Sequence, residues 1–355
     1  MMLRYLIAAS ALKAFSSNTW TKKLYRSLGD RFGGPLARRV TYMMSHVRRG
    51  NLFRELCEKY NVLVCGDKLL EIGTGWIHWH SLYHRLFYDV NISMLDVWDC
   101  RQLNALHELF GELRQVMKSD PATDSVVLDR LDMIMSANSF DELYQAFGLE
   151  YVVDERGSLE QFEDNSMSCV FSFHVLEHVP RESTAELARN IERVLKPGAY
   201  SIHQIGIDDH LTHYDSKASP KNYLRYSDNV WKRFFENNLQ YVNRLQMSEW
   251  LTMFADSGLS LMETQPVYCN IEGLKVHERF SGYSSEDLEC TILTLVHQKP
   301  QPRADMNRKH VIHGLIHVGR MKCCFFVFPL SMQPRYVNYK ALLVLSESFD
   351  MSGMR

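Results

Sequence analysis

One stretch constrains the fold of this chain more than any other, the run Asp67-Lys-Leu-Leu-Glu-Ile-Gly-Thr-Gly-Trp76. Its apolar part predicts a strand buried on both faces, and the two glycines predict a sharp turn that lets a ligand approach the backbone. Helix-like spacing of apolar residues follows over 79–88. About twenty residues beyond the glycines, the run Ile92-Ser-Met-Leu-Asp96 ends in an acid. This succession predicts a nucleotide or nucleoside site in a doubly wound sheet.

Strand-like and helix-like segments alternate over 67–205, which predicts a parallel sheet with helices on both faces. The further strands that we expect lie at 149–153, 164–173, 199–205, 259–269 and 289–297. The pair Pro197-Gly198 predicts a turn between a helix and the strand that begins at 199. The segment 99–149 is helical in pattern and longer than a minimal crossover, which indicates a helical insertion. The predicted fold is an α/β, Rossmann-like, doubly wound, seven-stranded mixed sheet.

Changes of pattern divide the chain into three parts. Residues 1–66 read as a basic helical segment that caps the first strand, and residues 67–300 hold the alternating elements of the predicted ligand-binding domain. Pro300-Gln-Pro302 marks the end of that domain. Residues 301–355 do not continue the pattern, and we expect a C-terminal extension whose role the sequence does not reveal.

The charge of the chain is small overall and uneven along its length. A formal net charge of −2 gives no bulk attraction to nucleic acid, so we expect no nucleic-acid partner. Residues 1–50, however, hold ten Lys and Arg against one acid, which suits a peripheral membrane surface or a partner protein. No Cys-x-x-Cys pair and no apolar run of the ~18–20 residues that span a bilayer occur, so we predict a cytoplasmic protein.

Three segments together resemble the class I S-adenosylmethionine (SAM) dependent methyltransferases of the type 11 kind. They are Leu70-Glu-Ile-Gly-Thr-Gly75, Phe162-Glu-Asp-Asn-Ser-Met-Ser-Cys-Val-Phe-Ser-Phe-His-Val-Leu-Glu-His-Val179 and Val194-Leu-Lys-Pro-Gly-Ala199. The resemblance covers about 67–299 and implies that SAM is the cofactor.

The resemblance also implies which residues bind the cofactor. Residues 71 and 73–75 would surround the methionine part of SAM. Asp96 would bind the ribose hydroxyls, and Val97 would lie beside the adenine. The loop at 157–159 would contact the adenine edge, and Phe173 with His174 would line the pocket near the reacting methyl. The implied cofactor residues are Glu71, Gly73, Thr74, Gly75, Asp96, Val97, Ser158, Leu159 and Phe173.

Methyl transfer needs alignment of donor and acceptor, exclusion of water and, for a hydroxyl acceptor, a base. The candidate catalytic residues are His174, His178, Asp209 and His210. His178 also has a structural interpretation, as a packing or capping residue near a helix start. Residues 208–213 hold side chains suited to a metal, but no second ligand cluster with clear spacing accompanies them, so we predict no metal site.

The sequence thus predicts a SAM-dependent methyltransferase that acts on a small-molecule or glycan-precursor acceptor, on oxygen rather than nitrogen. One alternative is an NAD-dependent oxidoreductase, although His78 stands where the dinucleotide fingerprint has its third glycine. Another is a non-catalytic binding protein that keeps the same fold. The aromatic and basic residues of 223–241 either contact a sugar or pack in a core, and the second interpretation is the simpler one.

Overall fold

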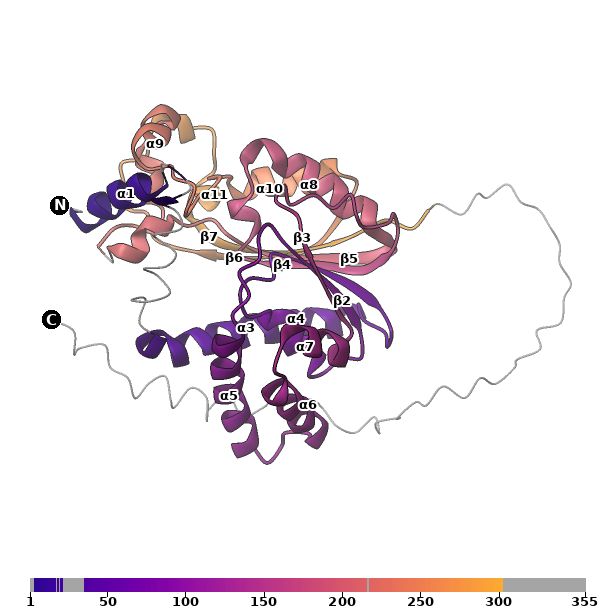
Figure 1. Ribbon diagram of the computed structural model, residues 1–355. Coiled ribbons are helices and arrows are strands. Elements are labelled where there is room, and N and C mark those ends of the chain that lie inside the picture. The colour runs from indigo at the N-terminus through magenta and orange to yellow at the C-terminus, as the bar shows by residue number, and fades with distance from the viewer. Residues whose placement is uncertain (1–2, 17, 19, 22–34, 216, 303–355) are drawn as a thin grey trace, which may run out of the picture.

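The computed structural model describes residues 3–16, 18, 20–21, 35–215 and 217–302 (Figure 1). The predicted extension over 301–355 therefore lies almost wholly outside the described residues. Four of the ten basic residues of 1–50 fall within 22–34, also outside them, so a basic surface there stays a prediction. None of the described helices has the length and apolar character needed to cross a bilayer.

A seven-stranded sheet in the order β3-β2-β1-β4-β5-β7-β6 forms the centre of the molecule, which confirms the predicted fold. The first five strands pair in parallel, and β7 runs antiparallel to both of its neighbours. The strands are β1 Lys68–Ile72, β2 Asn91–Asp96, β3 Leu149–Val153, β4 Met167–Phe173, β5 Leu195–Gly206, β6 Ser260–Tyr268 and β7 Cys290–Gln298.

Helices cover both faces of the sheet, as a doubly wound topology requires (Figure 1). One layer holds α3 Pro35–Tyr60, α4 Trp79–Arg85, α5 Leu103–Ser119, α6 Ser125–Ser136 and α7 Phe140–Phe147. The predicted helical insertion is the α5–α7 part of this layer. The opposite layer holds α8 Arg181–Val194 and α10 Met247–Asp256.

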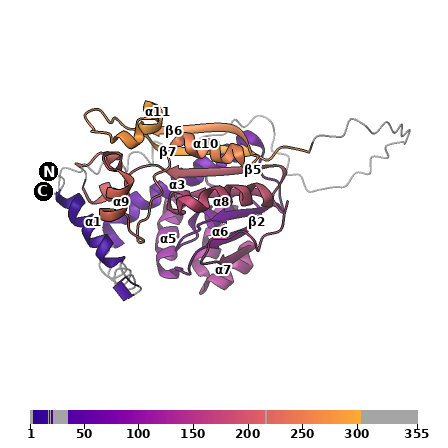
Figure 2. The ribbon, with the colours of Figure 1, turned by 90° about the horizontal axis from the view of Figure 1, so that it is seen from above.

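Beyond one end of the sheet, α1 Leu3–Phe15 lies with α9 Asp228–Phe234 and α11 Ser285–Glu289, as the two ribbon views agree (Figure 2). Single turns complete the fold: η1 Leu176–His178, η2 His210–Tyr214, η3 Asn222–Arg225 and η4 Glu278–Phe280.

Strand β4 shows why the central strands read as continuous apolar runs. All seven of its residues are buried, because helices cover both of its faces. Successive side chains point to opposite faces, so Phe171 joins the core under α3–α7 while Val170 joins the core under α8 and α10. The sheet therefore separates two hydrophobic cores.

The pair Pro197-Gly198 does not form the predicted turn ahead of a strand. Strand β5 already starts at Leu195, and its register against β4 shifts between Met167 and Cys169. Gly198 has a φ of 81° and donates its backbone N–H to Lys299 O at 2.8 Å. The pair therefore makes an irregularity inside the strand, where a glycine supplies the left-handed conformation.

The first helix packs far from the strand that it was expected to cap. Helix α1 contacts η2 and α9, and its Tyr5, Ala9 and Leu12 join a third hydrophobic cluster with Trp231 and Phe235. Aromatic residues of 223–241 thus pack in a core, as the simpler of the two interpretations held. Helix α3, in contrast, contacts α4 and α5 in the helical layer.

Candidate active site

A cavity of about 470 Å³ opens at the carboxyl ends of β1 and β2. Its walls come from those strand ends, the loop after β3, η1 and the first half of α8. The strand order reverses direction between β1 and β4, and ligands of open α/β sheets bind outside the strand ends at such a switch point. The cavity therefore lies where the sequence places the ligand.

The glycine turn after β1 shapes the floor of this cavity. Gly73 and Gly75 have φ angles of 73° and 70°, a conformation that side chains other than glycine rarely adopt. A Cβ on Gly73 would lie 2.4 Å from Val175 Cγ2, whereas a Cβ on Gly75 would meet no described atom within 4 Å. Gly73 N also donates to Leu95 O at 2.8 Å, which ties the turn to β2.

Asp96 ends β2 beside this turn and lines the cavity. Its Oδ2 accepts a hydrogen bond from Gly75 N at 2.9 Å, and its Oδ1 accepts one from Val97 N at 2.8 Å. Burial raises the pKa of the carboxyl, and these backbone donors offset part of the rise. Backbone N–H groups do not use all of its lone pairs, so the carboxylate can still accept a hydrogen bond from a hydroxyl in the cavity.

Behind the turn lies a chain of buried polar side chains. Glu71 accepts hydrogen bonds from Thr74 Oγ1 at 3.1 Å and from Ser81 Oγ, and burial raises the pKa of its carboxyl to about 7. Thr74 Oγ1 also pairs with His78 Nδ1 at 2.9 Å, and His78 Nε2 pairs with Tyr144 OH at 3.0 Å. Neither Glu71 nor Thr74 lines the cavity, so their side chains hold the turn in shape rather than face a ligand.

The wall opposite the turn includes three of the residues that we expect to bind the cofactor. Val97, Ser158 and Leu159 line the cavity. Gly157 has a φ of 64°, and a Cβ on it would lie 3.3 Å from Val97 Cγ1, a tight contact. The sequence did not indicate the part of the wall that α8 and its approach supply. Those lining residues include Pro180, Ser183, Glu186, Leu187 and Asn190.

Phe173 does not line the cavity, contrary to the expectation for it. Its ring stacks on His80 with centroids 4.2 Å apart, and it belongs to the core under α3–α7. The side chain points to the opposite face of the sheet from Val170, which places it away from the ligand. The structure gives Phe173 a packing role.

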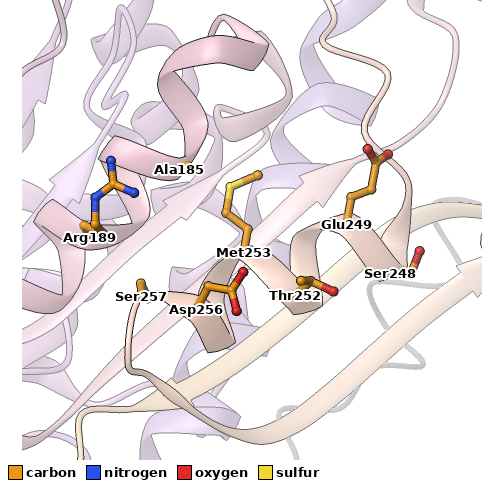
Figure 3. A pocket seen from close by; sticks show the side chains of 8 residues that line it. All are labelled: Ala185, Arg189, Ser248, Glu249, Thr252, Met253, Asp256 and Ser257. Atoms are coloured by element: carbon orange, nitrogen blue, oxygen red, sulfur yellow. The ribbon is translucent and has the colours of Figure 1, made fainter.

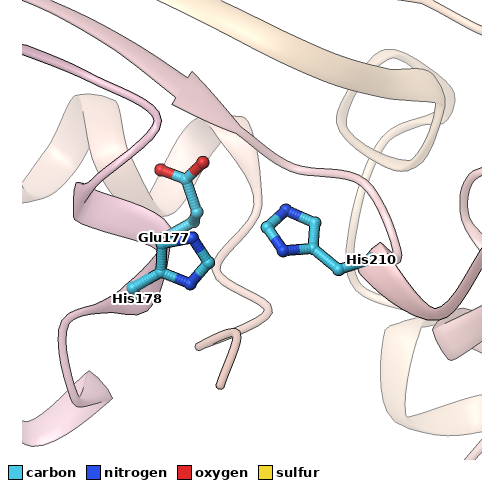
Figure 4. Close-up of side chains that lie close together, drawn as sticks. All are labelled: Glu177, His178 and His210. Atoms are coloured by element: carbon cyan, nitrogen blue, oxygen red, sulfur yellow. The ribbon is translucent and has the colours of Figure 1, made fainter. Parts of the chain in front are cut away.

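Three of the four candidate catalytic residues gather around one buried carboxylate, that of Glu177. His174, which follows β4 with a φ of 55°, holds its Nδ1 3.3 Å from Glu177 Oε1 and, contrary to expectation, does not line the cavity. His178 and His210 lie on the other sides of it, with ring centroids 5.0 Å apart (Figure 4). Burial raises the pKa of Glu177, but the bond and charge of His174 outweigh it, so the pKa lies below its usual value.

The cluster borders the cavity through His178, whose ring lines it. His178 Nδ1 lies 2.6 Å from Tyr241 O, so this nitrogen carries a hydrogen and donates a hydrogen bond to the carbonyl. His210 stands at the start of η2, and burial lowers its pKa to about 4, which keeps the imidazole neutral near pH 7. Neutral imidazoles and a carboxylate can accept a proton from a bound hydroxyl.

Asp209, the fourth candidate, faces away from the cluster. Its carboxylate is fully buried, accepts hydrogen bonds from Tyr5 OH at 2.6 Å and Leu211 N at 3.0 Å, and has a pKa raised by burial to about 7. These contacts give Asp209 a structural role, in which it fastens helix α1 to the loop after β5.

A second hollow of about 400 Å³ lies between α8 and α10 (Figure 3). Its side chains include Arg189, Met253 and Asp256, and none of the candidate residues lines it. It lies on the helical layer rather than at the strand ends, so it lacks the features of a ligand site in this fold.

Comparison with known families gives one match. A profile described as a methyltransferase domain matches residues 131–202. The matched range includes β3, β4, α8 and the first half of β5. The glycine turn and Asp96 lie before it, so their assignment depends on the geometry described above. No match was found among curated proteins.

Solved structures that are similar to this chain have low sequence identity to it. Phosphoethanolamine N-methyltransferase 2 of Haemonchus contortus, solved with S-adenosyl-L-methionine, is 15% identical, with a TM-score of 0.41, over 71% of this chain and 53% of that one. A SAM-dependent methyltransferase of Methanosarcina mazei is 16% identical, with a TM-score of 0.40, over 68% of this chain and 97% of that one. The present chain thus spans about half the length of the Haemonchus protein, and scores of this size carry no argument on substrate.

Proposed function

We propose that this chain is a class I SAM-dependent methyltransferase and that it moves a methyl group to a hydroxyl oxygen of a small molecule or glycan precursor. The observation that carries the proposal is a cavity lined by Gly73 of the glycine turn, by Asp96 and by His178 of the Glu177 cluster. Bound SAM would supply a sulfonium carbon that is already activated for displacement, so the protein has to position, desolvate and deprotonate the acceptor.

The described residues fit the cofactor. The left-handed turn at Gly73 and Gly75 leaves open space above its second glycine, which suits a group that lies against the backbone. Asp96 can still accept a hydrogen bond from a ribose hydroxyl, and Val97 with Leu159 offers apolar surface to an adenine ring. A cavity of about 470 Å³ lies within the usual range for sites of this kind.

The choice of a hydroxyl acceptor is supported by the side chains beside the cavity. A neutral amine attacks with its own lone pair, whereas a hydroxyl must lose its proton, and bases that accept protons near neutral pH are therefore useful. Three histidines and one carboxylate meet there, and Asp208 with the half-exposed His213 extends this polar group outward. Those outer residues are suited to the hydroxyls of a sugar or similar acceptor.

Titration with SAM tests the cofactor site. Asp96→Asn removes the charge that would bind the ribose, and loss of charge-assisted hydrogen bonds of about 1.5–3 kcal/mol should weaken binding by roughly 10–100-fold. Asp99→Asn, in the same loop but paired with Arg101 outside the cavity, is the matched control and should bind as the parent does. Calorimetry measures both. Equal affinity in the two folded variants would contradict the proposed role of Asp96.

The alternatives make different predictions for the same measurements. An oxidoreductase would bind NAD in place of SAM, yet His78 occupies the third-glycine position and, with a φ of 47°, starts helix α4. A non-catalytic protein would bind SAM without forming product. Incubation with labelled SAM and candidate alcohols, phenols and sugars, followed by mass analysis, separates these cases. Methyl transfer only to amines would refute the oxygen acceptor.

A further inference from the structure

Glu177, His178 and His210 bring one ligand atom each to within 4.8 Å of one another (Figure 4). We propose that these three side chains hold a divalent cation of the first transition series, such as Zn²⁺, Fe²⁺ or Mn²⁺, and that a hydroxyl of the acceptor completes its coordination. Residues 208–213 alone lacked a second ligand cluster, but the fold places Glu177 and His178 beside them. The prediction that no metal site exists was based on sequence spacing, which does not reveal that Glu177 and His178 lie close to His210.

The carboxylate of Glu177 is the first reason for a cation. Its residue is only 2% exposed, and neither of its oxygens accepts a hydrogen bond of good geometry from the described residues. The one basic side chain paired with it among the described residues is His174, with Nδ1 3.3 Å from Oε1. A buried carboxylate with a single such partner keeps free lone pairs, and buried charges are usually paired or bound to a metal.

The orientation of His178 is the second reason. Its Nδ1 lies 2.6 Å from Tyr241 O and donates to it, which in the neutral imidazole makes Nε2 the nitrogen that can bind a cation. Histidines that bind metals nearly always donate their other N–H to a carbonyl or carboxylate, because this fixes the ring and its tautomer. His178 therefore has the second contact that a metal ligand needs.

The position of His210 completes the set. Strand β5 ends at Gly206, and a Cβ there would lie 2.6 Å from Glu177 Oε1 and 3.3 Å from Asp208 Oδ1. The absence of a side chain at Gly206 leaves room for the carboxylate of Glu177 beside the segment that carries His210. Asp208 Oδ1 lies 3.7 Å from His210 Nε2, which is a suitable place for an outer carboxylate that orients the ring.

The ligand types indicate the class of cation. Two imidazoles and one carboxylate suit Zn²⁺, Fe²⁺ or Mn²⁺ and leave coordination positions open, whereas Mg²⁺ and Ca²⁺ prefer sites made wholly of oxygen. Because the His178 ring also lines the nucleoside cavity, an open position can face the acceptor.

The role in the reaction depends on the proposed function, while metal binding itself does not. The cation would lower the pKa of the bound acceptor hydroxyl. The O–H bond then breaks, and its proton passes to solvent water. A bond forms between the acceptor oxygen and the methyl carbon as the carbon–sulfur bond breaks, with its electron pair left on sulfur. The cation is not consumed.

Metal titration of the full chain tests the site directly. Protein treated with a chelator and then dialysed is titrated with Zn²⁺, Mn²⁺ and Co²⁺ by calorimetry, and bound Co²⁺ is also followed by its visible absorption. We expect one ion per chain. Glu177→Gln and His210→Asn should each lower the affinity by at least about 100-fold, since loss of even an outer partner costs ~10–100-fold.

Two matched variants act as controls. Glu182→Gln changes an exposed carboxylate on α8, and His213→Asn changes a neighbouring histidine that is 64% exposed, and both should leave metal affinity unchanged. Thermal unfolding of each variant verifies that it folds. Absence of bound metal in the parent, or equal affinity in Glu177→Gln, would overturn the site. An equal loss in His213→Asn would overturn the assigned ligands.

The two proposals fail separately. SAM binding, measured on metal-free protein, depends on Asp96 and tests the proposed function alone. If metal binds with the expected ligands but methyl transfer is equally fast after chelation, the role of the cation toward the acceptor is refuted.

Discussion

Gly73 and Gly75 share a left-handed conformation but differ in their surroundings, and this difference makes a quantitative prediction. An alanine at either position carries the conformational cost of a left-handed residue, about 1–2 kcal/mol. At Gly73 the new Cβ would also lie 2.4 and 2.6 Å from the two γ-carbons of Val175, and overpacking of this kind costs typically ~1–3 kcal/mol. We therefore expect Gly73→Ala to destabilise the protein by about 2–5 kcal/mol and Gly75→Ala by about 1–2 kcal/mol.

Denaturant unfolding measures both values, and a double-mutant cycle isolates the steric part. Val175→Ala removes the two γ-carbons, so the double variant Gly73→Ala/Val175→Ala should regain most of the ~1–3 kcal/mol assigned to overpacking. The pair Gly75→Ala/Val175→Ala is the control and should show additive losses, because no described atom lies within 4 Å of that Cβ. If Gly73→Ala costs no more than Gly75→Ala, the close approach of Val175 does not restrict the turn and the reasoning fails.

Two further predictions concern buried carboxyls. The pKa of Glu71 is raised by burial to about 7 from 4.5, so the folded state keeps a proton that the unfolded state loses, and stability falls as the pH rises between these values. Glu71→Gln should make the decrease in the free energy of unfolding between pH 5 and pH 8 smaller by roughly 1–3 kcal/mol, as measured by unfolding curves at the two pH values. An unchanged decrease would show that the pKa of Glu71 is not raised. Tyr5→Phe removes a donor to the buried Asp209 and should cost about 1–3 kcal/mol in the same assay, and a change near zero would mean that this bond adds nothing to the docking of α1.

Much of the sheet was predictable because its signals are local. The strand bounds followed from short apolar runs, and the glycine turn followed from residues that must adopt positive φ. Asp96 was singled out because an acid at the end of the second strand of such a unit commonly binds ribose hydroxyls. These features depend on neighbours in sequence, and the structure agrees with them to within a few residues.

The wrong predictions for Phe173 and Asp209 have one physical cause: the sequence does not reveal the direction in which a side chain points. A strand buried on both faces has no polar side to mark inside from outside, so Phe173 gave no sign that it points into the core under α3–α7. The loop after β5 has no period, so the sequence does not reveal that Asp209 points to Tyr5 while Asp208 and His210 lie near each other. Only the tertiary structure reveals that Glu177 stands between His174 and His210.

The hydrogen bond from Tyr5 to Asp209 has a consequence for the order of assembly. It joins residues 204 positions apart, so helix α1 depends for its packing on a loop that is synthesised much later. Closing a loop of this length is entropically costly, and such contacts form late. We expect the sheet to form before α1 docks, so that the segment carrying His210 becomes fixed only when the two distant parts of the polypeptide have met.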